Sequence, residues 1–218
     1  MRIKKLYSAL FSDIGYPFNA IADNCTTVKS PTDIVERESA LIVWGGADID
    51  PNLYGHKSSK LTSTGGVRDF LEWNLMCRAK ELGIPIIGVC RGAQMLCALA
   101  GGSLYQHTTG HAGRNHLVET YDGEIFTTNS IHHQMLNLSG TNHELLAWSK
   151  DRLSDTYIVE DDMTAENPTE KEPEFVFFPD VLGFAIQWHP EVMDNVSLAT
   201  QYILKEIYAR CAETEVQG

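Results

Sequence analysis

The sequence predicts an α/β protein in which a mostly parallel, twisted central sheet is flanked by helices. Apolar runs of strand length occur at residues 40–46 and 84–89, and a segment with helical spacing lies between them at 67–82. A second helical segment follows at 91–100. Strands that alternate with helices pair in parallel, because a parallel connection needs a long crossover. The chain has 218 residues, enough for one sizeable core, so we expect a single domain over residues 1–218.

The first half of the chain divides into these elements in order. Residues 1–13 begin with a basic stretch, but the apolar part is short and no clear cleavage site follows it. We therefore expect a first strand there and not a signal peptide. In 67–82 the apolar side chains recur at helical spacing, and Gly83 marks the end of the helix. A pair of glycines closes the predicted helix at 91–100 in the same way.

The second half of the chain is richer in predicted strands. Short apolar runs separated by Gly, Asn and Asp occur at 116–121, 124–128, 144–149, 155–160, 174–178 and 182–188. The acidic, proline-containing segment 160–173 predicts an exposed loop between two strands and not a domain boundary. A final helix is expected over about 193–212.

Charge and cysteine content exclude several classes of protein. The formal net charge is −12, which argues against binding to nucleic acid or to an anionic membrane surface. No apolar run approaches the roughly 20 residues that a membrane helix needs. The five cysteines are odd in number, widely spaced and form no CxxC motif, so we expect neither a disulfide framework nor a zinc ribbon. A reducing cytoplasm is the simplest interpretation.

The motif "GVCRG" follows the predicted strand 84–89 and leads directly into a helix. A strand that turns sharply into a helix at Gly-x-Cys-x-Gly is typical of a nucleophile elbow, which leaves Cys90 at the carboxyl end of the strand. The helix N-terminus favours the thiolate, and the backbone N–H of Arg91 is free to stabilise an oxyanion. The alternative is that Cys90 is one more small buried residue, as free cysteines often are. Cys97, without an elbow, is expected in the core.

A cysteine nucleophile needs a base, and "FAIQWHPE" at the end of the last predicted strand offers one. Pro190 forces an extended path after His189. Residues two apart in an extended chain point to one side, so Glu191 can reach the imidazole of His189 and fix its tautomer.

Together, GxCxGxQ and a distal HPE over residues 40–195 resemble the class I glutamine amidotransferases of the Cys-His-Glu triad type. The resemblance implies a flavodoxin-like fold with Cys90, His189 and Glu191 as the catalytic residues. It also implies that the backbones of Gly46 and Arg91 form the oxyanion hole.

Further motifs resemble the gamma-glutamyl-gamma-aminobutyrate hydrolase, or peptidase C26, branch of that family. They are "GGADIDPNLYG" at 45–55, "GGSLYQH" at 101–107, "NSIHHQ" at 129–134, and Arg68, Asp69 and Glu72 on the first helix. The resemblance implies substrate contacts from Gln94, Ser130, His132 and His133. The polar run 129–134 can alternatively be a hydrogen-bonded turn beside the sheet.

A metal site is the remaining alternative for the histidines. His107, His111, His116 and His133 could suggest one, but no cysteine or carboxylate spacing supports it, so we expect no metal and no cofactor. Asp48 and Asp50 are expected to cap a loop and not to act in catalysis.

The expected activity is hydrolysis of the gamma-glutamyl amide bond of glutamine or of a gamma-glutamyl amine, through a glutamyl thioester. The segment between His107 and His116 is short, which leaves the leaving amine open among ammonia, gamma-aminobutyrate, a polyamine and others. A second hypothesis is a glutaminase subunit that passes ammonia to a separate synthetase partner, since the sequence carries no P-loop or dinucleotide fingerprint. A third is a binding protein on an inactive enzyme fold. The sequence does not predict the oligomeric state.

Overall fold

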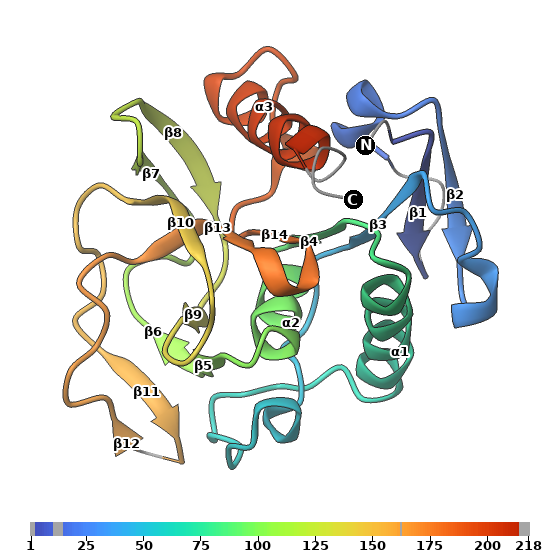
Figure 1. Cartoon of the computed structure of the whole chain (residues 1–218). Coiled ribbons are helices and arrows are strands. Elements are labelled where there is room, and N and C mark those ends of the chain that lie inside the picture. Colours follow the sequence, from blue (N-terminus) through green and yellow to red (C-terminus); the bar gives the residue numbers. More distant parts are fainter. Residues whose placement is uncertain (1–2, 11–14, 162, 214–218) are drawn as a thin grey trace.

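A nine-stranded mixed sheet forms the centre of the computed structural model, which describes residues 3–10, 15–161 and 163–213 (Figure 1). In spatial order the strands are β2 (Asn24–Val28), β1 (Lys5–Ala9), β3 (Ser39–Val43), β4 (Ile86–Val89), β14 (Gly183–Ile186), β13 (Pro173–Phe178), β10 (Glu144–Ser149), β7 (Arg114–Thr120) and β8 (Ile125–Ser130).

The first five strands of this sheet, β2-β1-β3-β4-β14, are all paired in parallel. Their order corresponds to the 2-1-3-4-5 order of flavodoxin-like folds, in which ligands bind at the carboxyl ends of the strands. Every residue of β3, β4 and β14 is buried, as expected for strands covered on both faces. From this topology we expect a ligand-binding site at the carboxyl ends of β3, β4 and β14.

The other four strands, β13, β10, β7 and β8, are joined by antiparallel pairings, including that of β13 with β14. Two small sheets lie beside this half. One pairs β5 (Ser103–Tyr105) with β9 (Met135–Asn137), and the other joins β6 (His107–Thr108), β11 (Tyr157–Glu160) and β12 (Met163–Thr164).

Helices cover both faces of the sheet (Figure 1). α1 (Val67–Leu82) and α2 (Arg91–Leu99) share one hydrophobic core with the sheet, whereas α3 (Leu198–Glu213) contributes to a core on the other face. Short 3-10 helices occur at Phe18–Ile21, Pro31–Asp33, Pro51–Tyr54, Pro179–Val181 and Pro190–Val192. Gly83 ends α1 in the left-handed conformation, as its position in the sequence predicts.

The α/β class and the helix–strand alternation of the first half are confirmed. The predicted strand at the N-terminus corresponds to β1, although residues 1–2 and 11–13 of that prediction lie outside the described residues. The final helix begins at Leu198, five residues later than expected, because a turn at 194–197 precedes it. The predicted loop 160–173 contains the short strand β12. The sequence patterns do not predict β2, β5, β6 and β9, which have at most five residues each.

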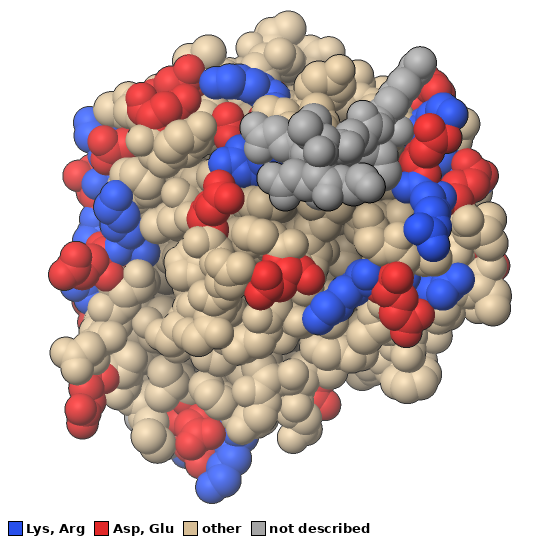
Figure 2. Space-filling model, in the orientation of Figure 1, with Lys and Arg blue, Asp and Glu red and all other residues tan. Residues whose placement is uncertain are grey.

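The helices and the charged side chains of the surface bear on membrane and nucleic-acid binding. Within the described residues, no helix combines the length and the apolar character needed to cross a membrane. On the face shown in Figure 2, Lys and Arg side chains lie among Asp and Glu side chains, and the described residues of that face form no continuous basic track. This pattern agrees with the acidic net charge of the chain.

Candidate active site

Cys90 lies on a sharp turn between β4 and α2. Its backbone has φ +51° and ψ −107°, in the left-handed half of conformational space, which costs about 1–3 kcal/mol for a residue with a side chain. The Cys90 N–H donates to the carbonyl of Ile186 on β14 at 2.7 Å, which fixes the turn to the neighbouring strand. Gly92 is required on the helix side, because a Cβ there would overlap the carbonyl of Val43. The predicted elbow is therefore present in the structure.

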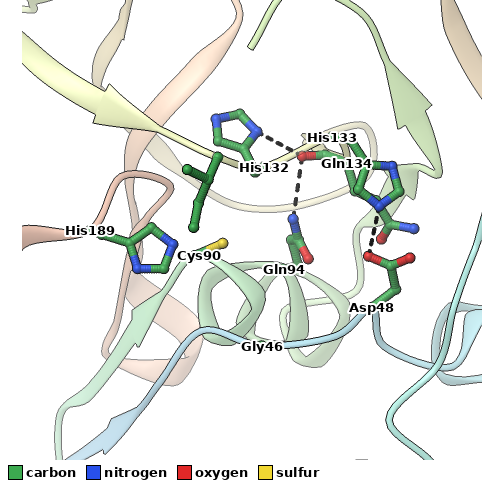
Figure 3. A pocket seen from close by; sticks show the side chains of 9 residues that line it. Gly46, Asp48, Cys90, Gln94, His132, His133, Gln134 and His189 are labelled. Atoms are coloured by element: carbon green, nitrogen blue, oxygen red, sulfur yellow. Dashed lines mark hydrogen bonds and ion pairs between the residues drawn. The ribbon is translucent and has the colours of Figure 1, made fainter. Parts of the chain in front are cut away.

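His189 follows the neighbouring strand β14 and lies beside Cys90 at one end of the pocket (Figure 3). Its Nδ1 is 2.6 Å from Oε1 of Glu191, the contact that the spacing of "HPE" predicts. Burial lowers the pKa of His189, but hydrogen bonding and charge interaction with Cys90 and Glu191 outweigh it and raise that pKa to about 10. The geometry thus favours an imidazolium next to the thiol sulfur.

Asn129 holds the backbone of His189, a role that sequence reasoning missed. Its Nδ2 donates to the carbonyl of His189 at 2.9 Å, and its Oδ1 accepts from the N–H of His189 at 2.8 Å. This paired contact connects β8 to the chain after β14. The motif "NSIHHQ" contained the residue, but only the fold reveals that its amide faces His189 and not the substrate pocket.

The loop after β3 places Gly45 next to Cys90 and His189, and Gly46 lines the same pocket as Cys90. The guanidinium of Arg68 donates from Nη2 to the carbonyls of Trp44 at 3.1 Å and Gly45 at 3.0 Å, and its Nε bonds Glu72 at 2.9 Å. A Cβ on Gly46 would displace this guanidinium, and the φ of +155° at Gly46 is one that residues with a side chain rarely adopt, so glycine is favoured there.

The side chain of Arg91 lies next to Gly46 of the same loop. It is fully buried and forms ion pairs with Asp69 and Glu72 on α1. Asp69 also accepts a hydrogen bond from the backbone N–H of Asp50 at 3.0 Å. Arg68, Asp69 and Glu72, which the sequence singled out only by resemblance, therefore form a network beneath the predicted oxyanion loop.

A pocket of about 150 Å³ opens beside Cys90 (Figure 3). Its lining residues are Gly46, Asp48, Cys90, Gln94, Ile131, His132, His133, Gln134 and His189. The volume is below the 300–1,000 Å³ typical of sites for drug-sized molecules, so it suits a small metabolite or one end of a larger one.

The pocket wall is held together by polar contacts. Gln94 Nε2 donates to the carbonyl of Gln134 at 3.3 Å, and Nδ1 of His132 lies 2.9 Å from the same carbonyl. His133 Nε2 contacts Oδ1 of Asp48 at 3.0 Å. This contact raises the pKa of His133 although burial opposes it. Three of the four predicted substrate-contact residues, Gln94, His132 and His133, therefore line the pocket.

Ser130, the fourth, lies elsewhere. It lines a separate, more open hollow of about 450 Å³ together with Gly113, Arg114, Asn115, Asn129 and Ile131. Ser130 is the last residue of β8, and it is not among the residues that line the pocket of His132 and His133. The two hollows share Ile131, and the substrate contact predicted for Ser130 stays a prediction.

The remaining expectations concern Asp48, Asp50 and Cys97. Asp50 accepts from the N–H of Asn52 at 3.0 Å and caps a 3-10 helix, as expected. Asp48 accepts from the N–H of Ser63 at 2.8 Å, but it also lines the pocket, which exceeds a capping role. Cys97 is fully buried, and burial raises its pKa to about 12, so it is a core residue as predicted.

The histidines considered for a metal site separate into two groups. His107 contacts His133, Nδ1 to Nδ1, at 3.3 Å near the pocket. His111 and His116 instead lie with Glu172 and Glu174, two buried carboxylates that sequence reasoning missed. No local spacing connects these groups, because antiparallel pairing of distant strands brings them together.

Comparison with known proteins identifies the family. The Peptidase C26 family model matches residues 21–127. A putative glutamine amidotransferase-like protein, YvdE, of Lactococcus lactis is 28% identical over 84% of this chain and 77% of its own length. Protein NtpR of Enterococcus hirae is 30% identical over 79% of this chain and 75% of its own.

Two further matches extend the comparison. A carbamoyl phosphate synthase small chain of Streptococcus mutans is 32% identical over 58% of this chain and 31% of its own length. A solved glutamine amidotransferase from Thermotoga maritima covers all of this chain and 85% of its own, with a TM-score of 0.59 and 14% identity. That structural likeness concerns the fold alone.

Proposed function

Because the chain belongs to the class I glutamine amidotransferase-like proteins of the peptidase C26 family, we propose that it is a cysteine-dependent hydrolase of gamma-glutamyl amide bonds. The substrate is glutamine or a gamma-glutamyl amine, and glutamate is a product. The observation that carries the proposal is the elbow cysteine Cys90 beside the hydrogen-bonded pair His189–Glu191, at the carboxyl edge of adjacent parallel strands.

In the first half of the reaction, the Cys90 thiolate attacks the gamma-carbonyl carbon of the substrate. The carbonyl oxygen becomes an oxyanion, which the backbone N–H groups of Gly46 and Arg91 stabilise. The His189 imidazolium then gives its proton to the leaving nitrogen as the C–N bond breaks. The pKa of about 10 supports this role, since His189 keeps that proton at neutral pH.

In the second half, the neutral His189 removes a proton from water, and the water attacks the glutamyl thioester. The C–S bond breaks, glutamate leaves, and Cys90 returns to the thiolate. Glu191 keeps His189 in the required tautomer and stabilises its cation throughout.

The pocket supports a glutamyl group as the recognised part of the substrate. Its wall offers the Gln94 amide, the His133 imidazole and the Asp48 carboxylate, which together can meet an alpha-amino and an alpha-carboxyl group. The cavity is too small to enclose a bulky amine as well. We therefore propose that the leaving amine projects out of the pocket mouth. The odd number of free cysteines further supports a reducing compartment such as the cytoplasm.

A glutaminase subunit that delivers ammonia to a synthetase is the second candidate. The match to a carbamoyl phosphate synthase small chain supports it, because a small chain by its name has a larger partner. In this case the catalytic residues keep the same roles, and the partner protein orders the oxyanion loop after β3.

The test is glutamate release by the purified protein and by its Cys90→Ala variant. Both are incubated with glutamine and with a panel of gamma-glutamyl amines. We expect the wild type to release glutamate and to show the mass of a glutamyl adduct after quenching. We expect the variant to lose activity by at least about 10³-fold, as removal of a triad nucleophile does elsewhere.

The relative rates separate the two candidates. Release from a gamma-glutamyl amine well above release from glutamine indicates a free-standing hydrolase. Slow release from glutamine alone indicates a glutaminase subunit that needs its partner. No adduct and no release from any substrate would contradict both candidates.

A further inference from the structure

A buried cluster of three histidines and two glutamates lies behind the pocket wall. His111 comes from the turn between β6 and β7, His116 from β7, and His132 from the chain after β8. Glu172 and Glu174 flank the start of β13. Each of the five side chains is more than nine-tenths buried. Ionisable groups are rarely buried to this extent unless they are paired or bind a metal, so the cluster needs an explanation.

Three imidazole nitrogens converge on one carboxylate oxygen, Oε1 of Glu174. His116 Nε2 lies at 2.9 Å, His111 Nδ1 at 3.3 Å and His132 Nε2 at 3.6 Å. Only the contact of His116 is a hydrogen bond. Within the described residues, His111 Nδ1, His132 Nε2 and the other oxygen of Glu174 have no hydrogen-bond partner.

The outer contacts of the two rings determine where their hydrogens lie. His132 Nδ1 faces the carbonyl of Gln134 at 2.9 Å, and a carbonyl only accepts, so Nδ1 carries the hydrogen. By the same argument, His111 Nε2 carries a hydrogen toward Oε2 of Glu172 at 3.1 Å. In a neutral ring the other nitrogen then presents a lone pair. The lone pairs of His111 and His132 then both face Glu174, an arrangement that is repulsive unless a proton or a metal cation lies between them.

We propose that His111 Nδ1, His132 Nε2 and the Glu174 carboxylate bind a divalent transition-metal ion, with Zn²⁺ as the ion that fits best. The ligand atoms of these residues all lie within 4.8 Å of one another. Tetrahedral Zn²⁺ with bonds of about 2.0–2.1 Å needs ligand atoms roughly 3.3 Å apart, close to the observed separations from Glu174. Two imidazoles and a carboxylate are ligands that zinc commonly uses.

The surrounding residues match the outer shell of a metal site. A metal-binding histidine usually donates its other N–H to a carboxylate or a backbone carbonyl, as His111 does to Glu172 and His132 does to Gln134. His116 donates to Glu174 and orients that carboxylate. The charges also balance, because two carboxylates and three neutral histidines around a divalent cation sum to zero.

The site adjoins the pocket of Cys90 but does not depend on its reaction. His132 lines that pocket, and the carbonyl of Gln134 receives both His132 and Gln94. An ion that holds His132 in position also fixes this wall. Its expected contribution is to the stability of the wall, while the bond-breaking groups stay Cys90 and His189.

A metal-free cluster is the competing state. Burial lowers the pKa of His111, but its hydrogen bond to Glu172 and its charge interaction with Glu172 and Glu174 outweigh the effect of burial and raise that pKa to about 9. In that state a proton on Nδ1 of His111 stands where the ion would bind. The two states differ in metal content and in their response to a chelator, and both are measurable without knowledge of the substrate.

The experiment uses the full chain purified without a polyhistidine tag from cells grown with added Zn²⁺. Metal content is measured by mass spectrometry before chelation, after chelation, and after Zn²⁺ is added back. We expect about one zinc ion per chain, a lower melting temperature after chelation, and recovery on re-addition. Reloading with Co²⁺ should give the visible absorption of a tetrahedral site.

Variants assign the ion to its ligands. We expect Glu174→Gln and His132→Gln to lose the zinc, whereas His143→Gln, an exposed histidine that contacts Thr141, keeps it. Cys90→Ala should also keep it, which excludes binding at the catalytic thiol. If a variant fails to fold, chelation and reloading of the wild type still decide. The proposal would be overturned if the wild type carried no zinc and its melting temperature changed with neither chelator nor Zn²⁺. It would also be overturned if a folded Glu174→Gln variant retained all of its zinc.

Discussion

The two halves of the central sheet differ in how they use their residues. In the parallel half, the groups proposed for catalysis follow directly after the strands that carry them, with Gly46 after β3, Cys90 after β4 and His189 after β14. In the antiparallel half, the important side chains come from turns and from strand ends far apart in the chain. His132 follows β8 and Glu174 lies on β13, at opposite ends of the strand order β13-β10-β7-β8, yet His132 Nε2 and Glu174 Oε1 are 3.6 Å apart.

In the parallel half, the position of a residue directly after its strand places it among the groups proposed for catalysis. In the antiparallel half, the pairing between strands decides which side chains form the wall of the pocket. The parallel half concentrates its reactive groups at one edge, as open α/β sheets do. The antiparallel half instead holds that edge in shape, through Asn129 on the His189 backbone and Gln134 on Gln94. Substitutions in the first half should therefore reduce turnover, and substitutions in the second half should mainly change substrate binding.

Glu191→Gln should have the largest effect among the substitutions that leave Cys90 in place. The amide keeps the shape of the carboxylate but removes the negative charge that holds the His189 tautomer and cation. We expect kcat to fall by roughly 10²–10⁴-fold, the range seen when a triad carboxylate becomes an amide. Glutamate release measured against Glu81→Gln, an exposed change on α1, provides the comparison. A variant with wild-type kcat would mean that Glu191 has no part in the reaction.

The pH profile sharpens the same point. Contact with Cys90 and Glu191 raises the pKa of His189 to about 10 despite burial. The proton that the leaving nitrogen needs is therefore retained at neutral pH and lost as the pH rises through about 10. We expect kcat/KM to fall about tenfold per pH unit above that value. In Glu191→Gln the loss of negative charge lowers the pKa, so the alkaline limb should move to lower pH. An unmoved limb would assign it to another group.

Arg68→Lys should have the next largest effect, because Arg68 holds the loop after β3 by its carbonyls. A lysine cannot bond Trp44, Gly45 and Glu72 at once, since its ammonium lacks the planar fork of arginine. Loss of one oxyanion donor costs about 10²–10³-fold, and Arg68 acts on that donor indirectly, so we expect kcat to fall by roughly 10–100-fold with a smaller change in KM. Arg78→Lys, also on α1 but at the surface, is the matched control. Equal losses in both variants would indicate a general effect on α1.

Much of the parallel half could be predicted from the sequence. The helix at 67–82 has the bounds that its apolar spacing and Gly83 predict, and the turn at Cys90 is the one that "GVCRG" indicates. The contact between His189 and Glu191 follows from their separation of two residues. In each case the sequence pattern and the local structure that it predicts involve residues close together in the chain, so the prediction does not require knowledge of strand pairing.

The antiparallel half could be predicted only as a set of strands. Its pairings decide which side chains meet, and sequence patterns do not specify them. Glu174 lies inside an apolar run, where no sequence pattern indicates a role for it. The pairing of β13 with β10 places it near His116 of β7. The motif groups Ser130 with His132, yet the two residues line different hollows. The motif identified the right segment but not the direction of each residue.

His133→Asn should have the smallest effect and tests the wall alone. The substitution removes the imidazole, which contacts Asp48 at 3.0 Å inside the pocket and His107 at 3.3 Å beside it. Such a contact contributes about 0.5–1.5 kcal/mol, so we expect KM for glutamine or a gamma-glutamyl amine to rise by roughly 2–12-fold with kcat nearly unchanged. His143→Asn, at an exposed site outside the pocket, should leave both constants as they are. A loss in kcat larger than the rise in KM would show that the wall acts on the bond-breaking step, and the division of roles between the two halves of the sheet would then be wrong.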